Sequence, residues 1–173
     1  MTLQEIQALI KDVPDFPKPG ILFKDITPLL AHPAGFAATV EHLASRVADL
    51  DADAVLGIES RGFIFGAVLA QHLALPLQLV RKRGKLPREA ISIRYELEYG
   101  FDHLEIHTDA IEPGGRYFIV DDLIATGGTA AAVAKLVRQQ QGLVASCLFV
   151  IELGFLDGRK MLEGFPVQSL IRY

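Results

Sequence analysis

Residues 116–129, with the sequence RYFIVDDLIATGGT, decide the fold of this chain. The apolar run 117–120 is rich in β-branched and aromatic residues, which is typical of a strand buried on both faces of a parallel sheet. Asp121 and Asp122 follow where such a strand reaches the carboxyl edge of the sheet, and a small turn then leads into an Ala-rich helical pattern. Because loop N–H groups and a helix N-terminus attract anions, the stretch predicts a phosphate site. The turn consists of Ala125, Thr126, Gly127, Gly128 and Thr129.

The glycine spacing excludes two common kinds of phosphate site. A Walker loop needs G-x-x-x-x-G-K, a dinucleotide site needs G-x-G-x-x-G, and the chain contains neither spacing. The two acids ahead of the turn suit a sugar instead, since carboxylates accept hydrogen bonds from two vicinal hydroxyls. We therefore expect a 5-phosphorylated ribose whose 2- and 3-hydroxyls are unsubstituted. In the plainer alternative, Asp121 and Asp122 tie down a turn and Thr129 caps a helix, but capping needs one polar residue rather than this whole set.

Composition indicates one compact domain. The chain has 173 residues, of which 50% are hydrophobic and 22% charged, and its formal net charge of −4 does not favour a general nucleic-acid-binding role. No apolar run approaches the length of a membrane span, and the N-terminus lacks a signal-peptide pattern. Because Cys147 is the single cysteine, no internal disulfide can form, and we expect a cytoplasmic setting with this thiol in the core.

A second strand, turn and helix unit supports a parallel sheet. Residues 54–58 form an apolar strand pattern, the polar turn 59–62 contains Arg61, and a helical pattern follows over 63–73. Alternating strands and helices place both turns at one edge of the sheet, so Arg61 can meet phosphate oxygens there. The alternative is an ordinary surface cation. Further strands are predicted at 75–80, 143–153 and 167–171, with helices at 33–50 and 157–162.

The basic run RKRGKLPR, residues 81–88, follows the strand at 75–80. It carries five cations in eight residues within an acidic protein, and therefore makes a local positive patch. Charge runs are often only solvated. At a sheet edge that already carries a phosphate site, this patch suits a pyrophosphate better than a nucleic-acid backbone.

Two further segments are candidates for binding a base and covering the site. After a short helix at 2–12, the prolines and Gly20 of residues 14–20 predict a rigid loop that presents ILFKD, residues 21–25, outside the sheet. Phe23 could stack on a flat heterocycle or merely anchor the loop in the core. Residues 91–107 predict a hairpin-like excursion that could act as a lid, on which Glu98 is either a proton-transfer group or a surface acid. The histidines lack the spacing of a transition-metal site.

The central stretch resembles the phosphoribosyl-pyrophosphate motif of the type I phosphoribosyltransferases, an apolar strand followed by paired acids and a T-G-G-T-like loop. Four more pieces, DFPKPGILFKDITPLL, GIESRGFIFG, VRKRGKLPRE and LEYGFDHLEIHTDAIEPG, are similar to the adenine-specific members of that family. The resemblance implies an α/β fold with a central, mostly parallel sheet flanked by helices, a small hood and a flexible β-hairpin-like loop. It also implies a single phosphoribosyltransferase domain over residues 1–173, in which residues 1–33 form the base-binding hood.

The activity implied by the resemblance is the reaction of adenine with phosphoribosyl pyrophosphate to give AMP and pyrophosphate, a step of purine salvage. Mg²⁺ would be bound mainly through the substrate, with no direct protein ligand, and the family is homodimeric, with part of the basic loop reaching across. Asp121 and Asp122 would bind the ribose hydroxyls, and the turn 125–129 the 5-phosphate. The residues expected to meet pyrophosphate are Arg61, Lys82 and Lys85.

The same resemblance assigns the base contacts. Phe23 would stack on adenine, the backbone of Leu22 and Lys24 would read its edge, and Glu98 would exchange a proton near N7 or N9. Many members carry Arg where this chain has Lys24, so a side-chain role at that position does not carry over directly.

Three other functions remain open from the sequence. The nearest is a type I enzyme for a 6-oxopurine such as hypoxanthine or guanine. A second is a regulatory protein that keeps the sugar-diphosphate site but binds nucleic acid, which predicts a basic surface that this composition lacks. The third is a structural phosphate-binding domain, in which Phe23 and Glu98 would have no role.

Overall fold

The computed structural model describes residues 1–96 and 100–173. The chain divides into two compact units, Met1–His42 and Leu43–Tyr173. Each unit has its own secondary structure, and each is described separately below.

The first unit contains a short helix and a two-stranded sheet. Helix α1 (Leu3–Ala8) begins with a capping box, in which the backbone N–H groups of Thr2 and Glu5 each donate to the other residue's side chain. Strands β1 (Lys11–Pro14) and β2 (Leu22–Asp25) pair antiparallel. Helix α2 (Thr27–Leu30) follows, and α3 (Pro33–Ser45) begins in this unit.

Two predictions for this unit were wrong in detail. The helix expected over 2–12 ends at Ala8, because the chain enters β1 at Lys11. The segment at 21–25, expected to lie outside the sheet, is indeed not part of the seven-stranded sheet, but Leu22–Asp25 form β2, whose pairing with β1 was not predicted. The prolines permit this pairing because Pro14 is the last residue of β1 and the others lie in the connecting loop, where no ladder N–H is needed.

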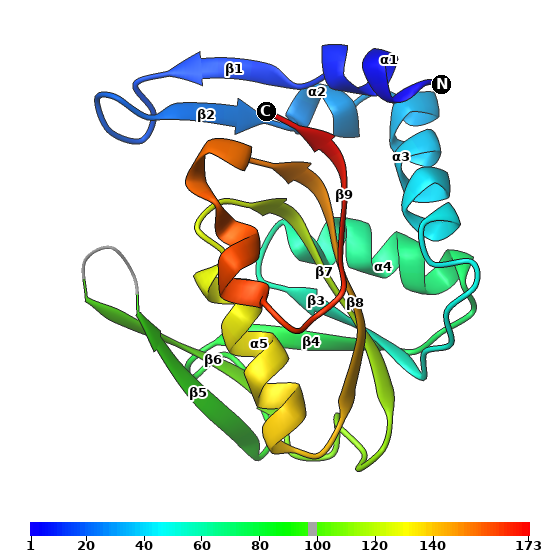
Figure 1. Cartoon of the computed structure of the whole chain (residues 1–173), viewed down its shortest axis with the longest axis vertical. Coiled ribbons are helices and arrows are strands. Elements are labelled where there is room, and N and C mark those ends of the chain that lie inside the picture. Colours follow the sequence, from blue (N-terminus) through cyan, green and yellow to red (C-terminus); the bar gives the residue numbers. More distant parts are fainter. Residues whose placement is uncertain (97–99) are drawn as a thin grey trace. The chain divides into compact units, whose positions relative to one another are not determined.

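The second unit is built on a seven-stranded sheet with the order β5-β6-β4-β3-β7-β8-β9 (Figure 1). Neighbouring strands from β4 to β9 along this order are parallel, whereas β6 pairs antiparallel with β4 and with β5. The predicted central, mostly parallel sheet is therefore confirmed, and the described parts of the excursion at 91–107 are two antiparallel strands at the edge of the sheet. The strand bounds are β3 Ala54–Ile58, β4 Leu77–Lys82, β5 Ala90–Glu96, β6 Phe101–His107, β7 Arg116–Ile124, β8 Leu143–Glu152 and β9 Val167–Arg172.

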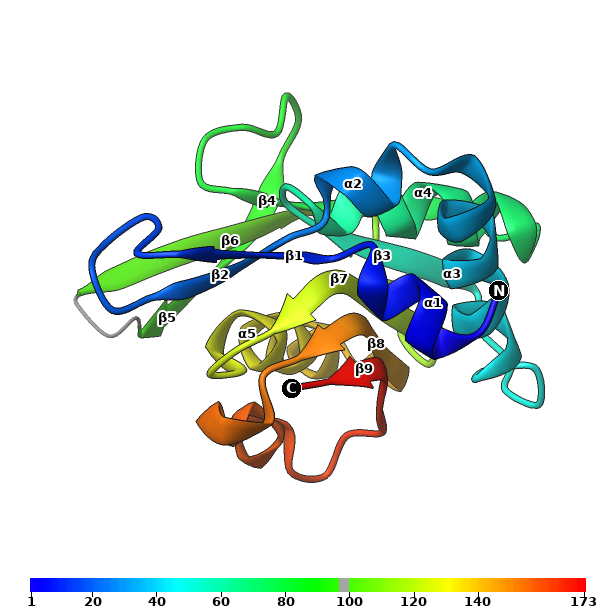
Figure 2. The same cartoon turned by 90° about the horizontal axis from the view of Figure 1, so that it is seen from above.

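Two helices cover the sheet of this unit. Figure 2 shows α4 (Gly62–His72) and α5 (Gly128–Gln139) on opposite faces of the sheet, and the short 3₁₀ turns η1 (Gly154–Leu156) and η2 (Gly158–Leu162) follow β8. All five residues of β3 are buried, as expected for a parallel strand covered on both faces. Cys147 in β8 is fully buried, and burial raises the pKa of its thiol to about 12, which agrees with its predicted place in the core.

Two strands extend further than the sequence pattern predicts. Asp121 and Asp122 lie inside β7, which continues to Ile124 because its backbone keeps pairing with β8. Arg81 and Lys82 are the last residues of β4, where they pair with β6. The side chains at the ends of these strands are polar, so the hydrophobic pattern stops before the backbone pairing does.

Among the described residues, no helix has the length and apolar character needed to span a membrane.

Candidate active site

A cavity of about 330 Å³ lies in the second unit, where polar residues from the ends of several strands meet. A smaller hollow of about 100 Å³ adjoins it, because Asp121, Leu123 and Thr129 line both. The other residues of the smaller hollow include the turn 125–128 that precedes α5. The larger cavity is lined by Glu59, Ser60, Arg61, Lys82, Tyr95, Asp102, Leu104, Asp121, Asp122, Leu123 and Thr129.

The two neighbouring aspartates carry charges that the fold only partly compensates. Asp122 Oδ2 lies 3.0 Å from Arg61 Nη2 in an ion pair, but no described residue gives this buried oxygen a well-aligned hydrogen bond. Asp121 Oδ1 accepts a hydrogen bond of 2.9 Å from the backbone N–H of Asp122. Burial raises the pKa of both carboxyls; the charge of Asp122 raises that of Asp121 further, and Arg61 opposes the rise at Asp122. The pair is therefore suited to accept additional hydrogen bonds.

The turn before α5 has the geometry of an anion cradle. Gly127 adopts a left-handed conformation with φ of 83° and precedes the first residue of α5. A Cβ at Gly127 would overlap the carbonyl oxygen of Gly158, and a Cβ at Gly158 would overlap the carbonyl oxygen of Ala125. Backbone packed this closely fixes the shape of the turn. The positive end of the α5 dipole then faces the hollow lined by residues 125–129.

Glu59 organises the basic residues beside the larger cavity. Its carboxylate accepts hydrogen bonds from Lys85 Nζ at 2.7 Å, from the backbone N–H of Lys82 at 3.0 Å and from Arg81 Nε at 3.3 Å. Burial alone would raise the pKa of Glu59, but these three donors lower it to about 2. Lys82 lines the cavity, whereas Lys85 reaches it through Glu59.

The edge hairpin contributes a second acid and base pair. Lys82 Nζ lies 3.0 Å from Asp102 Oδ2, and the Tyr95 hydroxyl donates to the same oxygen at 3.4 Å. Tyr95 and Asp102 are direct partners in the β5–β6 register, which explains how they meet. The hydrogen bond from Lys82 lowers the pKa of Asp102, and the hydrogen bond with Asp102 raises that of Lys82. Glu98, predicted on this hairpin, lies outside the described residues.

The residues predicted to contact a base all lie in β2 of the first unit. Leu22 has 47% of its surface exposed. Phe23 packs edge to face against Phe16, with 5.1 Å between ring centroids. Lys24 is buried, and its Nζ lies 2.5 Å from Asp12 Oδ1, so this cation already has a partner on β1. The role of these residues, and of residues 1–33 as a hood, stays a prediction.

The carboxylates of the larger cavity are hard oxygen ligands of the kind that Mg²⁺ uses. Within residues 1–96 and 100–173, no group of three or more His, Cys, Asp or Glu side chains is arranged to hold a metal ion.

The structure thus brings most of the predicted sugar and phosphate residues to one place. Asp121, Asp122, Arg61 and Lys82 share the larger cavity, and the turn 125–129 borders the smaller one. Among the lining residues that sequence reasoning missed are the ionisable side chains of Glu59, Tyr95 and Asp102. Glu59 stands two positions before Arg61 in the same turn, and an acid there, ahead of a basic run, was the available signal.

Comparisons with known proteins agree with this geometry. The family model of the phosphoribosyl transferase domain matches residues 25–159. An adenine phosphoribosyltransferase of Rubrobacter xylanophilus is 54% identical, over 99% of this chain and 94% of its own. The crystal structure of adenine phosphoribosyltransferase from Thermoanaerobacter pseudethanolicus superposes with a TM-score of 0.97 at 52% identity, covering 99% of this chain and all of that one.

A third relative has been solved with bound ligands. The adenine phosphoribosyltransferase from Saccharomyces cerevisiae, solved with an imino-altritol bisphosphate and adenine, has a TM-score of 0.91 and 42% identity, with 97% of each chain covered. The family resemblance inferred from the motifs is therefore confirmed.

Proposed function

Because this chain belongs to the phosphoribosyl transferase domain family and is similar over nearly its whole length to adenine phosphoribosyltransferases, we propose that it makes AMP from adenine. The 5-phosphoribosyl group would come from phosphoribosyl pyrophosphate, and pyrophosphate would leave. This reaction recovers a free purine base as a nucleotide. The observation that carries the proposal is the pair of under-compensated aspartates beside a glycine cradle and two cations.

Each part of the cavity suits one part of the sugar diphosphate. The turn 125–129 offers N–H groups and a helix N-terminus to the 5-phosphate. Asp121 and Asp122 would accept hydrogen bonds from the two ribose hydroxyls, which supply the donors that Asp122 Oδ2 lacks. Arg61 and Lys82, with Lys85 held by Glu59, would meet the pyrophosphate.

The proposed chemistry needs no protein nucleophile. When the C1–O bond to pyrophosphate lengthens, positive charge develops on the ribose ring and negative charge on the leaving group. The aspartates would lie beside the first charge and the cations beside the second, so the preorganised site stabilises both. A bound Mg²⁺ would add charge neutralisation on the diphosphate oxygens. A base nitrogen then attacks C1 and loses its proton, for which we propose Glu98 as the acceptor.

We propose that the base binds at β2. Phe23 would stack on the ring, and the backbone at Leu22 and Lys24 would pair with its edge. Since the Lys24 side chain is held by Asp12, the reading of the base would rest on backbone groups and not on that ammonium. The adenine in the yeast relative's structure supports adenine as the base.

A turnover assay with each purine tests the proposal. We expect purified chain, phosphoribosyl pyrophosphate and labelled adenine to give labelled AMP in the presence of Mg²⁺, and much less product when Mg²⁺ is removed by chelation. Hypoxanthine and guanine should react at least about a hundredfold more slowly, because a site that pairs with an amino group leaves polar groups unpaired against an oxo group. If a 6-oxopurine turns over faster than adenine, that 6-oxopurine and not adenine is the preferred substrate. If no purine turns over, the proposal is refuted.

We also propose a homodimer in a cytoplasmic setting. The loop that follows β4 carries Arg83, Lys85 and Arg88 and is the segment expected to reach a second subunit. Light scattering on the purified chain tests this, since a monomeric mass at micromolar concentration would contradict it.

A further inference from the structure

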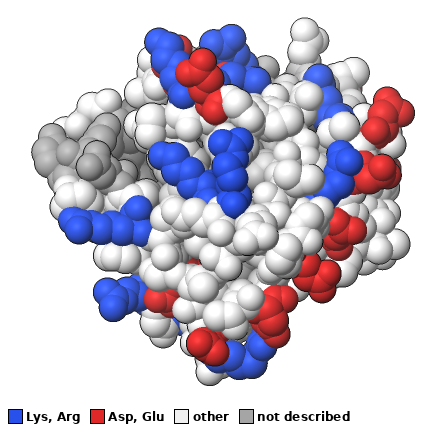
Figure 3. Space-filling model, turned by 60° about the horizontal axis from the view of Figure 1, so that its bottom comes forward, with Lys and Arg blue, Asp and Glu red and all other residues white. Residues whose placement is uncertain are grey.

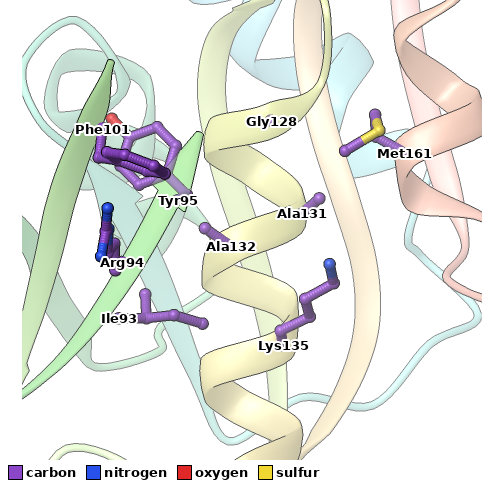
Figure 4. Close-up of a pocket in the computed structure, with 9 residues that line it drawn as sticks. All are labelled: Ile93, Arg94, Tyr95, Phe101, Gly128, Ala131, Ala132, Lys135 and Met161. Atoms are coloured by element: carbon purple, nitrogen blue, oxygen red, sulfur yellow. The ribbon is translucent and has the colours of Figure 1, made fainter. Parts of the chain in front are cut away.

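A second, larger pocket of about 470 Å³ lies beside the edge of the seven-stranded sheet. It is bounded by the β5–β6 hairpin on one side, by α5 in the middle and by η2 on the other (Figure 4). Among the described residues, two lining residues are shared with the site proposed above, Tyr95 with the larger cavity and Gly128 with the phosphate turn, whereas the other seven line this pocket and neither of those cavities. The lining residues are Ile93, Arg94, Tyr95, Phe101, Gly128, Ala131, Ala132, Lys135 and Met161.

The walls of this pocket present apolar surface that the fold leaves uncovered. Phe101 has 55% of its surface exposed and Met161 has 52%. Ala131 and Ala132 carry short side chains on α5, so the helix forms a shallow floor between these two residues (Figure 4). An aromatic ring and a thioether that stay exposed beside a hollow favour an apolar, flat occupant.

The charges around the pocket are all positive. Arg94 lies on the hairpin side and Lys135 on α5, and the described lining residues include no acid (Figure 4). The N-terminal end of α5 at Gly128 adds a partial positive charge. Figure 3 shows Lys and Arg side chains near the middle of one face of the molecule, while Asp and Glu side chains lie mainly toward the right and lower edges of that face. The chain as a whole has a net charge of −4, so this pocket differs in sign from the average surface.

Arg94 is held in a way that preserves its donors. Its guanidinium carbon lies 3.4 Å from the centroid of the Phe101 ring. The two residues are diagonal neighbours in the β5–β6 register, because Arg94 pairs with His103 and Phe101 stands two residues before it. Stacking uses the flat face of a guanidinium and leaves its N–H edge able to donate to an anion. The stacked pair therefore combines an aromatic surface with an anion-binding edge.

We propose that this pocket binds a small aromatic anion, a flat ring that carries a phosphate, sulfonate or carboxylate. The ring lies against Phe101, the two alanines and Met161, and the acidic group meets Arg94 and Lys135. A pocket of 470 Å³ is within the ordinary range for small-molecule sites, about 300–1,000 Å³. The inference goes beyond the proposed function and does not depend on it.

The test uses two fluorescent probes that share the same rings. Anilinonaphthalene sulfonate is anionic, whereas phenylnaphthylamine is its uncharged counterpart. We expect saturable binding of the sulfonate to the full-length chain at one site. Lys135→Gln should weaken the sulfonate about fivefold and leave the uncharged probe unchanged, because one exposed charge pair is lost. Phe101→Ala should weaken both probes by roughly tenfold, because both lose the stacking surface.

A matched control lies on the same helix. Gln139→Glu changes the net charge by the same amount as Lys135→Gln, at an exposed position of α5 that does not line the pocket. It should leave both probes unchanged. If Lys135→Gln and Gln139→Glu weaken the sulfonate equally, or if Phe101→Ala changes neither probe, the proposal is overturned. Thermal unfolding of each variant verifies that the exposed substitutions leave the fold intact.

Two further binding measurements show where the sulfonate binds and which chemical class of natural ligand competes with it. Joint Asp121→Asn and Asp122→Asn substitution should leave sulfonate binding unchanged; loss of binding there would put the probe in the other cavity and overturn the proposal. Displacement by GMP would indicate a nucleotide and displacement by anthranilate an aromatic carboxylate, while displacement by neither would overturn it. Because these readouts are binding and not turnover, they fail or succeed independently of the adenine reaction.

Discussion

The neighbouring strands β7 and β8 each bury an acid near their carboxyl ends, yet the two acids have opposite surroundings. Asp122 in β7 is 3% exposed and Glu152 in β8 is 4% exposed. Glu152 accepts hydrogen bonds from Arg159 at 2.7–2.9 Å and from Ser169 at 2.5 Å, whereas Asp122 has an ion pair with Arg61 and the buried carboxyl of Asp121 beside it. Hydrogen bonds from Arg159 lower the pKa of Glu152, and burial raises that of Asp122.

From this difference we expect Glu152 to be a structural acid and Asp122 to be an acid that binds a ligand. Equal burial says nothing about role, because both side chains are almost fully enclosed. What differs is the supply of donors, which is complete within the fold at Glu152 and incomplete at Asp122. A folded protein that keeps a costly, under-compensated carboxylate next to a cavity is arranged for a partner that brings its own donors.

The largest expected effect comes from replacing Asp121 and Asp122 together by Asn. The affinity for phosphoribosyl pyrophosphate should fall at least about a hundredfold, because two charge-assisted hydrogen bonds to hydroxyls are each worth roughly 1.5–3 kcal/mol. The affinity for adenine should change far less. Calorimetric titration with each ligand measures both. The same variant should unfold at a higher temperature than the parent, since it no longer buries adjacent charges; unchanged sugar-diphosphate affinity would refute the assigned role.

Glu152→Gln should have the opposite outcome. The free energy of unfolding should fall by about 2 kcal/mol, because the Arg159 guanidinium loses its carboxylate partner, although Arg159 keeps some contact with water. KM for both substrates should stay within about twofold, as no ligand contact is removed. Urea unfolding and steady-state kinetics test this. Ser169→Ala is the matched smaller change and should cost less; a rise in KM without loss of stability would contradict the structural role.

A third prediction concerns Glu59, which resembles Glu152 in one respect and Asp122 in another. Its carboxylate accepts hydrogen bonds from within the fold, but the residues that donate them include the cations expected to meet pyrophosphate. Glu59→Gln should raise KM for phosphoribosyl pyrophosphate about fivefold, because Lys85 and Arg81 lose the carboxylate that positions them. The KM for adenine serves as the internal control. Tighter binding of the sugar diphosphate would show that Glu59 competes with pyrophosphate rather than orients its partners.

The smallest effect is a difference in how stability depends on pH. Glu152 has a lowered pKa when folded, so its contribution is present above its usual value of 4.5 and is lost as the pH falls below it. Asp121 and Asp122 have raised pKa values, so they make folding less favourable as the pH rises above their usual 3.8. Subtracting each variant's unfolding curve from the parent's between pH 3 and pH 7 should give slopes of opposite sign. Slopes of the same sign would contradict the comparison.

The contrast also explains how far sequence reasoning reached. The aspartates and the glycine turn are contiguous, and the apolar run before them carries its own strand signal, so this part of the site could be predicted locally. The partners of Glu152 could not, because Arg159, Ser169 and Arg172 come from η2, β9 and its end, and meet only in the folded chain. The ends of β4 and β7 were missed for a related reason, because backbone pairing with a neighbouring strand decides where a strand ends.

Pairing also decided the largest error in the fold. The prolines and Gly20 at 14–20 predict a rigid loop, and most of that loop does connect β1 and β2, but the pairing of these two flanking strands with each other was not predicted. Sequence identifies such segments as rigid, and only the partner strand shows that they are sheet.

The contact between Gly127 and Gly158 has a consequence for the order of events during folding. The turn expected to grip phosphate takes its final shape only when the backbone of η2, far downstream in the sequence, is pressed against it. Because the ribosome adds residue 158 after residue 127, a nascent chain that stops before η2 has the motif but lacks the backbone that packs against the turn. Ligand capture would thus follow the synthesis of η2 and would mark the chains in which η2 has folded against the turn.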